Sequence, residues 1–249
     1  MEKRFAAIVL AAGKGKRMQS AVQKQFLLLD GKPLLWYSLE AFEHSPASDI
    51  ILVTGVEEVD YCRNAIVEAY GFQKVRAIVP GGKERYHSVY EGLKALKEQL
   101  GYGEEDYVMI HDGARPFADA GMIERVMKDA VTYGACVAGM PSKDTVKLSN
   151  EGGFAAETPD RSRVWTIQTP QTFSYSLIQE AYDKMMSREE YQHGVTDDAM
   201  VVESMTDRRV KLTEGSYRNI KVTTPEDMAV AEAFLAQNRN AQKQGEKRR

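Results

Sequence analysis

Residues 6–18 read Ala6-Ala7-Ile8-Val9-Leu10-Ala11-Ala12-Gly13-Lys14-Gly15-Lys16-Arg17-Met18, and this stretch decides the fold. In it, an apolar run of strand length leads into a short basic loop that is punctuated by glycine. Glycine backbone N–H groups can approach phosphate oxygens because no side chain stands in the way, and the flanking cations offset the phosphate charge. An open α/β sheet binds nucleotides at such a loop, beyond the carboxyl end of a strand. The stretch therefore predicts phosphate chemistry on a nucleotide.

The spacing of the loop excludes two common phosphate-binding motifs. A Walker loop ends in Gly-Lys-Ser or Gly-Lys-Thr, a tripeptide that the chain lacks. The dinucleotide-binding fingerprint requires a further glycine where this chain has Met18. On this segment alone, an ordinary glycine turn with solvated lysines stays a second interpretation.

The length of 249 residues and the net charge of −3 limit the possible functions. A chain of this length can bury one sizeable core, so we expect a single domain over residues 1–238. We expect the polar, basic tail 239–249 to be disordered because it offers almost nothing to bury. A general nucleic-acid binder carries a basic face, which the negative net charge argues against. Cys62 and Cys136 match no metal or redox spacing, and this favours a reduced, cytoplasmic setting.

The N-terminus is similar in one respect to a targeting segment. Lys3-Arg4 precedes the apolar run Phe5–Ala12, as in a short signal peptide. A strand explains the same residues better, because a basic glycine loop follows in place of the start of a mature domain. No other run approaches the ~20 apolar residues that a membrane-spanning helix needs, so we expect no membrane association.

Strand-like and helix-like segments alternate along the first part of the chain. The expected strands are nearly continuous apolar runs, as is typical of strands buried on both faces: Phe5–Leu10, Ile50–Thr54, Val75–Val79, Tyr107–Ile110 and Ala135–Met140. The expected helices carry apolar residues at helical spacing: Pro33–His44, Val59–Tyr70, Arg85–Leu100 and Met122–Tyr133. The alternation predicts a Rossmann-like α/β fold, with a mostly parallel twisted sheet and helices on both of its faces.

The alternation stops after Pro141. Residues 142–170 mix charge, glycine and proline with short β-like runs at Thr145–Leu148 and Val164–Ile167, which indicates a β-arm that protrudes from the sheet. Such an arm exposes unpaired strand edges, and a partner chain usually covers them. We therefore expect a homodimer formed through this arm.

Regular structure resumes nearer the C-terminus. Residues 196–198 (Thr-Asp-Asp) can cap a helix that runs to about Met205. Arg209–Thr213 and Ile220–Val222 are expected strands. Thr224-Pro225 opens a last helix.

Asp112 is the first candidate for chemistry, because it follows the expected strand Tyr107–Ile110. Mg²⁺ is usually held by one or two carboxylates together with phosphate oxygens, so Asp112 is a candidate metal ligand. A role as the N-cap of the next helix alone stays an alternative. The neighbouring His111 is better interpreted as a hydrogen-bonded core residue than as a catalytic one.

The basic residues fall into two groups. Arg17 and Lys24 share the first loop and could clamp a leaving pyrophosphate, whereas Arg161 and Lys221 could hold a second anion; for any one of them alone, a solvated role stays open. With an acidic metal ligand, these cations indicate two phosphorylated reactants. No serine–histidine or cysteine–histidine pair stands out as a nucleophile system. An attacking phosphate needs none, because catalysis then reduces to positioning and charge neutralisation.

A series of short motifs follows in order along the chain: Ala11-Ala12-Gly13-Lys14-Gly15-Lys16-Arg17-Met18, Gln23-Lys24-Gln25-Phe26, Gly81-Gly82-Lys83-Glu84-Arg85, His111-Asp112-Gly113-Ala114-Arg115-Pro116, Thr169-Pro170-Gln171, Thr196-Asp197-Asp198-Ala199 and Asn219-Ile220-Lys221-Val222-Thr223. In these motifs, roughly from Arg4 to Leu235, the chain resembles the 2-C-methyl-D-erythritol 4-phosphate cytidylyltransferase family of non-mevalonate isoprenoid biosynthesis, the 4-diphosphocytidyl-2-C-methyl-D-erythritol synthases. Several ordered motifs are far more specific than the glycine loop alone.

The resemblance implies that CTP and methylerythritol 4-phosphate give the cytidine diphosphate alcohol and pyrophosphate, with Mg²⁺. It implies that Arg17 and Lys24 stabilise charge on the triphosphate and that Asp112 binds the metal. The nucleotide contacts that it implies are Ala11, Ala12, Gly13, Gly15, Gly82, Ser88 and Gly113. The residues that would orient the sugar phosphate for in-line attack on the α-phosphate are Arg161, Lys221, Thr169 and Thr196, of which Thr196 could reach from a partner subunit.

Three positions depart from the family pattern. Leu10 stands where members often carry proline, and Lys83 stands where some carry an acidic residue. Gly113 replaces a common alanine, and we expect it to be tolerated because it is smaller.

Two other functions compete with this interpretation. Ribitol-5-phosphate cytidylyltransferase has the same fold, but its first loop tends towards Leu-Ala-Gly-Gly and its arm usually lacks the run Asp160–Trp165 found here. A non-catalytic nucleotide-sensing domain is the second alternative. The joint presence of Arg17, Lys24 and Asp112 argues against it, because sensing needs less charge at the leaving pyrophosphate.

Overall fold

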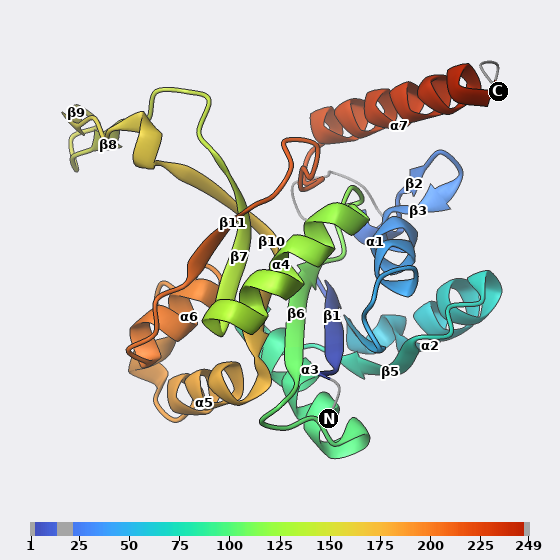
Figure 1. Ribbon diagram of the computed structural model, residues 1–249, viewed down its shortest axis with the longest axis horizontal. Coiled ribbons are helices and arrows are strands. Elements are labelled where there is room, and N and C mark those ends of the chain that lie inside the picture. The colour runs from blue at the N-terminus through green and yellow to red at the C-terminus, as the bar shows by residue number, and fades with distance from the viewer. Residues whose placement is uncertain (1–2, 14–21, 247–249) are drawn as a thin grey trace.

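A seven-stranded sheet forms the centre of the computed structural model, which describes residues 3–13 and 22–246 (Figure 1). Its strands are β1 (Phe5–Ala11), β4 (Asp49–Thr54), β5 (Val75–Pro80), β6 (Tyr107–Asp112), β7 (Ala135–Pro141), β10 (Trp165–Ser174) and β11 (Lys211–Glu214). In space they follow the order β11-β7-β10-β6-β1-β4-β5. The five strands expected before residue 142 are confirmed.

All but one of the paired strands in this sheet run parallel. β1 pairs in parallel with β4 and with β6, β4 pairs with β5, and β7 pairs with β11. β10 runs antiparallel between β6 and β7. A parallel neighbour requires a crossover, usually a helix, whereas β10 follows β7 through the arm and returns in the opposite direction. The expected mostly parallel, Rossmann-like sheet is therefore confirmed.

Helices cover both faces of the sheet. They are α1 (Leu34–Glu43), α2 (Val59–Tyr61) with its π-helical continuation η4 (Cys62–Glu68), α3 (Arg85–Leu100), α4 (Ala120–Tyr133), α5 (Tyr175–Met186), α6 (Asp198–Met205) and α7 (Pro225–Glu246). Short 3₁₀ turns and strands complete the chain: η2 (Lys24–Phe26), β2 (Leu28–Leu29), β3 (Lys32–Pro33), η3 (Val56–Glu58) and η6 (Glu189–Gln192). The four helices expected before residue 142 are confirmed, with α2 continuing in the π form.

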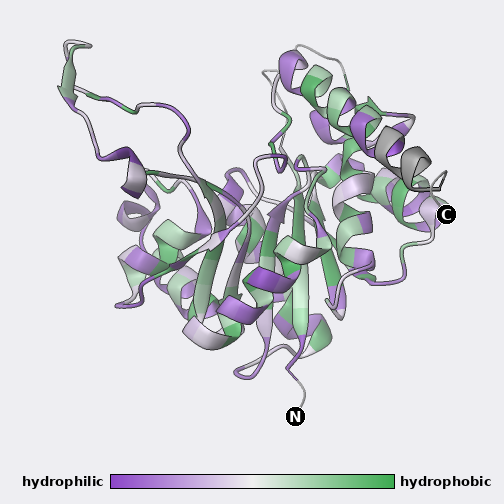
Figure 2. Ribbon diagram, turned by 45° about the horizontal axis from the view of Figure 1, so that its top comes forward, coloured by the Kyte–Doolittle hydropathy of each residue, from purple (hydrophilic) through white to green (hydrophobic). Residues whose placement is uncertain are grey.

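Successive side chains of β1 point to opposite faces, and each face has its own hydrophobic core. Ala7 and Val9 lie in a cluster with buried residues of α1, η4 and α4. Ala6 and Ile8 lie in a second cluster with residues of α3, α5 and α6. Figure 2 shows hydrophobic colours concentrated on the central strands and hydrophilic colours on the outer surfaces of the helices. The nearly continuous apolar strands therefore result from burial on both faces.

The strand order reverses at β1. β4 and β5 lie on one side of β1, whereas β6 lies on the other side, and Leu10 is the register partner of Asp112. Open α/β sheets bind ligands in the crevice at such a switch point, outside the carboxyl ends of the strands. The topology therefore places the ends of β1 and β6 where a ligand is expected.

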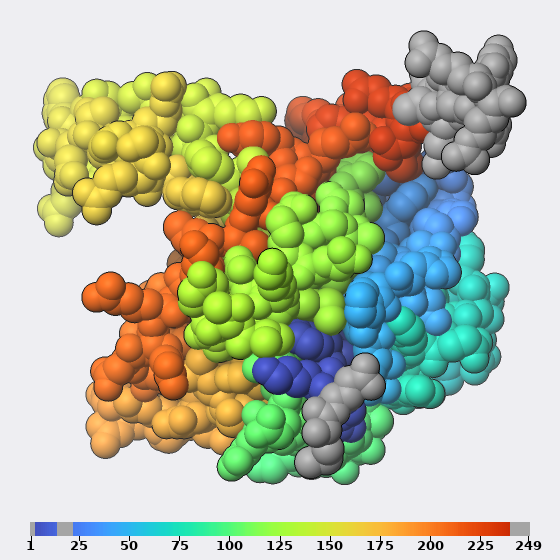
Figure 3. Space-filling model, in the orientation of Figure 1, coloured from blue at the N-terminus to red at the C-terminus, as the bar shows by residue number. Residues whose placement is uncertain are grey.

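The arm projects from the body between β7 and β10 (Figure 3). It contains the antiparallel pair β8 (Leu148–Ser149) and β9 (Ala155–Glu157) and the turn η5 (Arg161–Arg163). Trp165 already pairs with Pro141 in the main sheet. The projecting part is therefore residues 142–164, shorter than the expected 142–170, because the residues from Trp165 onward belong to β10.

Two segments near the C-terminus differ from the expectations. Ile220–Val222 is not a strand: the backbone N–H of Val222 donates to the Ala114 carbonyl at 2.8 Å, and these apolar side chains pack beneath α7. The structure also continues α7 through residues 239–246, where disorder was expected, and Arg239 pairs with Asp30 at 3.0 Å. In the first case a tertiary contact decides the conformation. Within the described ranges, no helix is long and apolar enough to cross a membrane.

Candidate active site

A cavity of about 180 Å³ lies at the carboxyl ends of β1 and β6. We call it the β1–β6 cavity; it is lined by Leu10, Ala11, Ala12, Gly13, Lys24, Gln25, Gly82, Lys83, Glu84, Arg85, Ser88, Asp112, Ala114 and Lys221. Lys24 comes from η2, Asp112 from the last position of β6, and Lys221 from the loop before α7. Residues far apart in the sequence thus place two lysines and one carboxylate around a single cavity.

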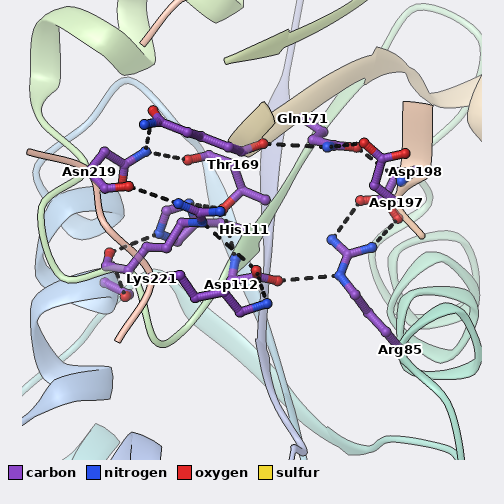
Figure 4. A network of polar contacts seen from close by, with 12 residues as sticks. Arg85, His111, Asp112, Thr169, Gln171, Asp197, Asp198, Asn219 and Lys221 are labelled. Carbon is purple, nitrogen blue, oxygen red and sulfur yellow. Dashed lines mark hydrogen bonds and ion pairs between the residues drawn. The ribbon is translucent and has the colours of Figure 1, made fainter. Parts of the chain in front are cut away.

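Asp112 is the centre of a cluster of ion pairs (Figure 4). The Lys221 Nζ lies 2.7 Å from Oδ2 of Asp112, and the Arg85 Nε lies 3.3 Å from Oδ1. The Arg115 Nε lies 3.9 Å from Oδ2. Burial by itself raises the pKa of Asp112, but Arg85, Lys221 and Arg115 outweigh it and hold the pKa well below its usual range. The carboxylate therefore keeps its negative charge at neutral pH.

Asp112 is not the N-cap of the next helix. That helix is α4, and its N-cap is Asp119, whose side chain accepts from the backbone N–H of Met122 at 2.8 Å. The alternative interpretation of Asp112 as a cap is wrong. Its carboxylate is instead turned towards the cations that line the cavity.

His111 is a core residue, as expected. Its side chain is fully buried, and burial lowers the pKa of His111 to about 4, so the ring is neutral. The Nε2 lies 3.2 Å from the carbonyl of Arg115, which can only accept, so Nε2 carries the proton. Nδ1 therefore accepts from the Thr169 hydroxyl at 3.0 Å, and the same hydroxyl oxygen accepts from the Asp112 N–H at 3.1 Å. This relay fixes the backbone that carries Asp112.

The loop before α3 forms another wall of the β1–β6 cavity. The Gly82 N–H donates to the Ser88 hydroxyl at 3.2 Å, so Ser88 holds the loop against the helix. A Cβ on Gly82 would overlap the Cβ of His87, which explains why glycine stands there. At Gly113 a Cβ would lie 2.9 Å from the Leu10 carbonyl. The smaller residue therefore suits the close approach of these two segments.

A second cavity, of about 140 Å³, shares Arg85, Asp112 and Lys221 with the first. We call it the β10 cavity; its other lining residues are Arg115, Ile167, Gln168, Thr169, Gln171, Thr196 and Asp197. Thr169 and Thr196 thus lie beside Lys221 within one chain. Among the described residues, the Nε of Arg115 is a buried donor without a hydrogen-bond partner. That nitrogen faces the Asp112 carboxylate at 3.9 Å. Three cations (Arg85, Arg115 and Lys221) and two carboxylates (Asp112 and Asp197) line the cavity, and this excess of positive charge suits an anion.

The segment that carries Lys221 is pinned on both sides. The fully buried Asn219 donates through Nδ2 to the Thr169 carbonyl at 2.8 Å, and its own carbonyl accepts from Arg115 Nη1 at 2.8 Å. The bond from Val222 to Ala114 holds the other side. Lys221 therefore projects from a fixed backbone between the two cavities.

Other predicted site residues lie elsewhere. Arg161 is exposed on the arm, lines neither cavity, and donates to the Lys143 carbonyl at 3.4 Å. One chain therefore does not bring Arg161 to Lys221. Arg17 and Gly15 lie outside the described residues.

Sequence reasoning missed the role of two charged residues. Arg85 stands in one of the motifs and Asp198 in another, but their mutual contact joins positions far apart in the chain. The Arg85 Nη2 lies 2.7 Å from Oδ2 of Asp198, and the Arg85 Nε reaches Asp112. The available signal was that each residue stands at the start of its helix, Arg85 in α3 and Asp198 in α6. That position does not identify the residue with which either one pairs.

Comparisons with known proteins show which family the chain belongs to. The model of the 2-C-methyl-D-erythritol 4-phosphate cytidylyltransferase family matches residues 5–237. The chain belongs to this family. A member from Lachnoclostridium phytofermentans is 49% identical over 241 residues, which cover 96% of this chain and 99% of the relative. One from Alkaliphilus oremlandii is 45% identical over 235 residues, covering 94% and 96%.

A solved structure supports the same assignment to the family. The crystal structure of 4-diphosphocytidyl-2C-methyl-D-erythritol synthase from Anaerococcus prevotii is 35% identical, with a TM-score of 0.81, and the match covers 94% of this chain and 96% of that one. Members of this family are cytidylyltransferases, so the chain is an enzyme of the nucleotidyltransferase class. The resemblance drawn from the motifs is confirmed, and the ribitol-5-phosphate and nucleotide-sensing alternatives are not favoured.

Proposed function

We infer that the protein transfers CMP from CTP to 2-C-methyl-D-erythritol 4-phosphate, giving 4-diphosphocytidyl-2-C-methyl-D-erythritol and pyrophosphate. Family membership supports the reaction. The observation that carries it in the structure is the convergence of Lys24, Asp112 and Lys221 on one cavity at the strand switch point. The reaction needs no protein nucleophile, because an oxygen of the acceptor phosphate attacks the α-phosphorus and pyrophosphate leaves.

In this proposal CTP occupies the β1–β6 cavity. Ala11, Ala12 and Gly13 would border the cytidine, and Gly82 and Ser88 would complete its pocket. Gly113 does not line this cavity itself, and its proposed contact with the nucleotide would be made beside Leu10. We propose that this pocket, bordered by small residues, is large enough for a pyrimidine but too tight for a purine. Backbone groups that pair with cytosine would penalise a base that leaves them unpaired. Lys24 would act on charge that develops as pyrophosphate departs. Arg17 and Gly15 are proposed to join it from the first loop.

Asp112 is proposed to hold the divalent cation, and the residues present fit Mg²⁺. Of the two carboxylates that line the cavity, Glu84 caps α3, and Asp112 is ionised among its cations. Mg²⁺ is commonly bound by one or two carboxylates together with substrate phosphates and water. Within the described part of the chain, no cluster of three acidic, histidine or cysteine ligands forms a complete protein site. The ion would neutralise phosphate charge when bound. Asp112 would orient it towards the phosphates of CTP.

The sugar phosphate is proposed to lie in the β10 cavity. Lys221 is placed between the two cavities and would hold the attacking phosphate near the α-phosphorus of CTP. Thr196 and Thr169 line the same cavity. The Thr169 hydroxyl donates to His111 and accepts from the backbone N–H of Asp112. Holding both reactants in one geometry lowers the entropy cost of reaction, which is the main contribution that such a site can make.

We propose that the enzyme is a homodimer formed through the arm. Phe154 is 74% exposed and Leu148 is 49% exposed on this arm, and large apolar side chains at that exposure favour burial against a partner. Arg161 is on the same arm and lines neither cavity of its own chain. A dimer in which each arm brings Arg161 to the other chain would reconcile its exposure with its proposed contact to the sugar phosphate. We also propose a cytoplasmic location, with no membrane or nucleic-acid partner.

The function is tested by following pyrophosphate release from CTP and Mg²⁺ in parallel reactions with methylerythritol 4-phosphate and ribitol 5-phosphate. We expect release with the first acceptor to exceed that with the second by orders of magnitude. Asp112→Asn, with its fold checked by thermal melting, serves as the inactive control. Equal or greater release with ribitol 5-phosphate would overturn the assignment of the acceptor.

A further inference from the structure

Arg85 joins two carboxylates that lie far apart in the sequence. It is the first residue of α3 and lines both cavities. Its Nη1 and Nη2 lie 2.9 Å and 2.7 Å from Oδ1 and Oδ2 of Asp198, which is a two-pronged contact. Its Nε faces Oδ1 of Asp112 at 3.3 Å. One planar guanidinium thus links the carboxylate proposed to hold the cation to a carboxylate at the start of α6 (Figure 4).

Asp198 is held more firmly than Arg85. Its side chain is fully buried, and its Oδ1 also accepts from the Tyr182 hydroxyl at 2.6 Å. Its backbone N–H donates to Oε1 of Gln171 at 3.0 Å, and Gln171 in turn donates to Asp197 at 2.9 Å. A buried carboxylate persists only when a cation and hydrogen bonds satisfy it. Arg85 is that cation, so Asp198 fixes the plane in which the guanidinium lies.

The charges at Asp112 give this link a consequence for cation binding. Arg85, Lys221 and Arg115 all face one carboxylate, and a cation such as Mg²⁺ must share it with them. Arg85 contacts two carboxylates, and its hydrogen bonds to Asp198 are shorter than its contact with Asp112. Asp198 therefore neutralises the charge of Arg85. Arg85 can then orient Oδ1 of Asp112 without adding an unbalanced positive charge beside it.

We propose that Arg85 and Asp198 form a positioning pair, which fixes the Asp112 carboxylate and keeps the charge beside it favourable to a divalent cation. The proposal rests on the proposed role of Asp112 as the cation ligand. The printed contacts of the Arg85 guanidinium go to the two carboxylates, and Asp198 is fully buried, so we assign both as positioning residues that act through Asp112. Because Asp198 is the first residue of α6, the pair couples the position of α6 to that of the Asp112 carboxylate.

Asp198→Asn tests the proposal, because it removes one negative charge and keeps the size of the side chain. We expect the affinity of the enzyme–CTP complex for Mn²⁺, measured from the electron paramagnetic resonance signal of free Mn²⁺, to fall at least about tenfold, or ~1.4 kcal/mol. Binding of CTP in EDTA, measured by calorimetry, should be unchanged or tighter, because the cavity gains positive charge. A merely structural defect would weaken both.

Asp106→Asn is the matched control. Arg4 also makes a two-pronged contact, from Nε at 3.0 Å and Nη2 at 2.6 Å to the two oxygens of Asp106, but at the amino end of β6, the strand whose carboxyl end carries Asp112. This variant should lower the melting temperature and leave Mn²⁺ affinity unchanged. If Asp198→Asn does not fold cooperatively, Arg85→Lys replaces it, since lysine keeps the charge and loses the fork. Arg85→Lys should also weaken Mn²⁺ binding and lower kcat.

The variants separate this proposal from the one on which it rests. If Asp112→Asn binds Mn²⁺ as tightly as the wild type, the assignment of Asp112 as cation ligand fails. If Asp112→Asn loses Mn²⁺ while the Arg85 and Asp198 variants keep wild-type affinity, only the positioning pair is overturned. Equal loss of Mn²⁺ affinity in Asp106→Asn would also overturn it, because the effect would then come from general destabilisation.

Discussion

Lys221→Met is the sharpest test of how the second substrate is held. Lys221 contacts Asp112 at 2.7 Å, projects from a pinned segment and lines both cavities. Methionine keeps the length of the side chain and removes its charge. A charge-assisted hydrogen bond to a phosphate contributes about 1.5–3 kcal/mol, so we expect kcat/KM for methylerythritol 4-phosphate to fall by about 10-fold to about 150-fold.

The expected effect of Lys221→Met on stability is small, and this separates activity from folding. The Lys221 side chain is 35% exposed, so its ion pair with Asp112 contributes about 1 kcal/mol or less. Such a loss lowers the melting temperature of a chain of this size by about 2–4 °C. Arg85 and Arg115 remain beside Asp112 to compensate its charge.

The assay for Lys221→Met varies methylerythritol 4-phosphate at saturating CTP and Mg²⁺, then varies CTP at a saturating level of the acceptor. Lys74→Met is the matched control, because the Lys74 Nζ donates to the Ser45 carbonyl at 2.6 Å just before β5, away from both cavities. It should keep wild-type kinetics. The reasoning is refuted if Lys221→Met leaves kcat/KM for the acceptor unchanged, or if it raises the KM for CTP by the same factor.

Three further variants address the other parts of the site. Lys24→Ala should lower kcat by about a hundredfold or more while changing CTP binding far less, because it acts on developing charge; equal losses in a kinetic comparison would contradict this role. Arg161→Ala should raise the KM for methylerythritol 4-phosphate and leave the KM for CTP unchanged, and an unaltered response to the acceptor would remove Arg161 from the site. Gly82→Ala should cost about 1–3 kcal/mol of stability and raise the KM for CTP, because its Cβ overlaps His87; wild-type melting and kinetics would show that the loop can move aside.

The parts of the fold that sequence predicted best are those decided by local signals. The helix Arg85–Leu100, predicted from the helical spacing of its apolar residues, is confirmed at both ends. In the structure a capping box between Glu84 and His87 begins it, and Gly101 ends it in the left-handed conformation at φ 65°. Apolar runs buried on both faces likewise identified β1 and β6. Where tertiary contacts decide, prediction failed: Ile220 and Val222 are apolar because they pack beneath α7 and not because they belong to the sheet.

The candidate site divides in the same way. Asp112, Lys24 and Lys221 stand in short motifs near strand ends or loops, where chemistry-bearing residues are expected, and the fold brings them to one cavity. The link from Arg85 to Asp198 joins α3 to α6 and has no signature at either position alone. In the proposed dimer, Arg161 would act on a second chain, which a single sequence does not position. Residue types were therefore predictable, whereas partners set by long-range contacts were not.

The most direct measurement is a crystal structure of the enzyme with CTP and Mn²⁺, in which the anomalous signal locates the ion. The account predicts CTP in the β1–β6 cavity, its phosphates beside Lys24, and Mn²⁺ bound by both those phosphates and Asp112. CTP bound outside this cavity, or Mn²⁺ without Asp112 as a ligand, would contradict it.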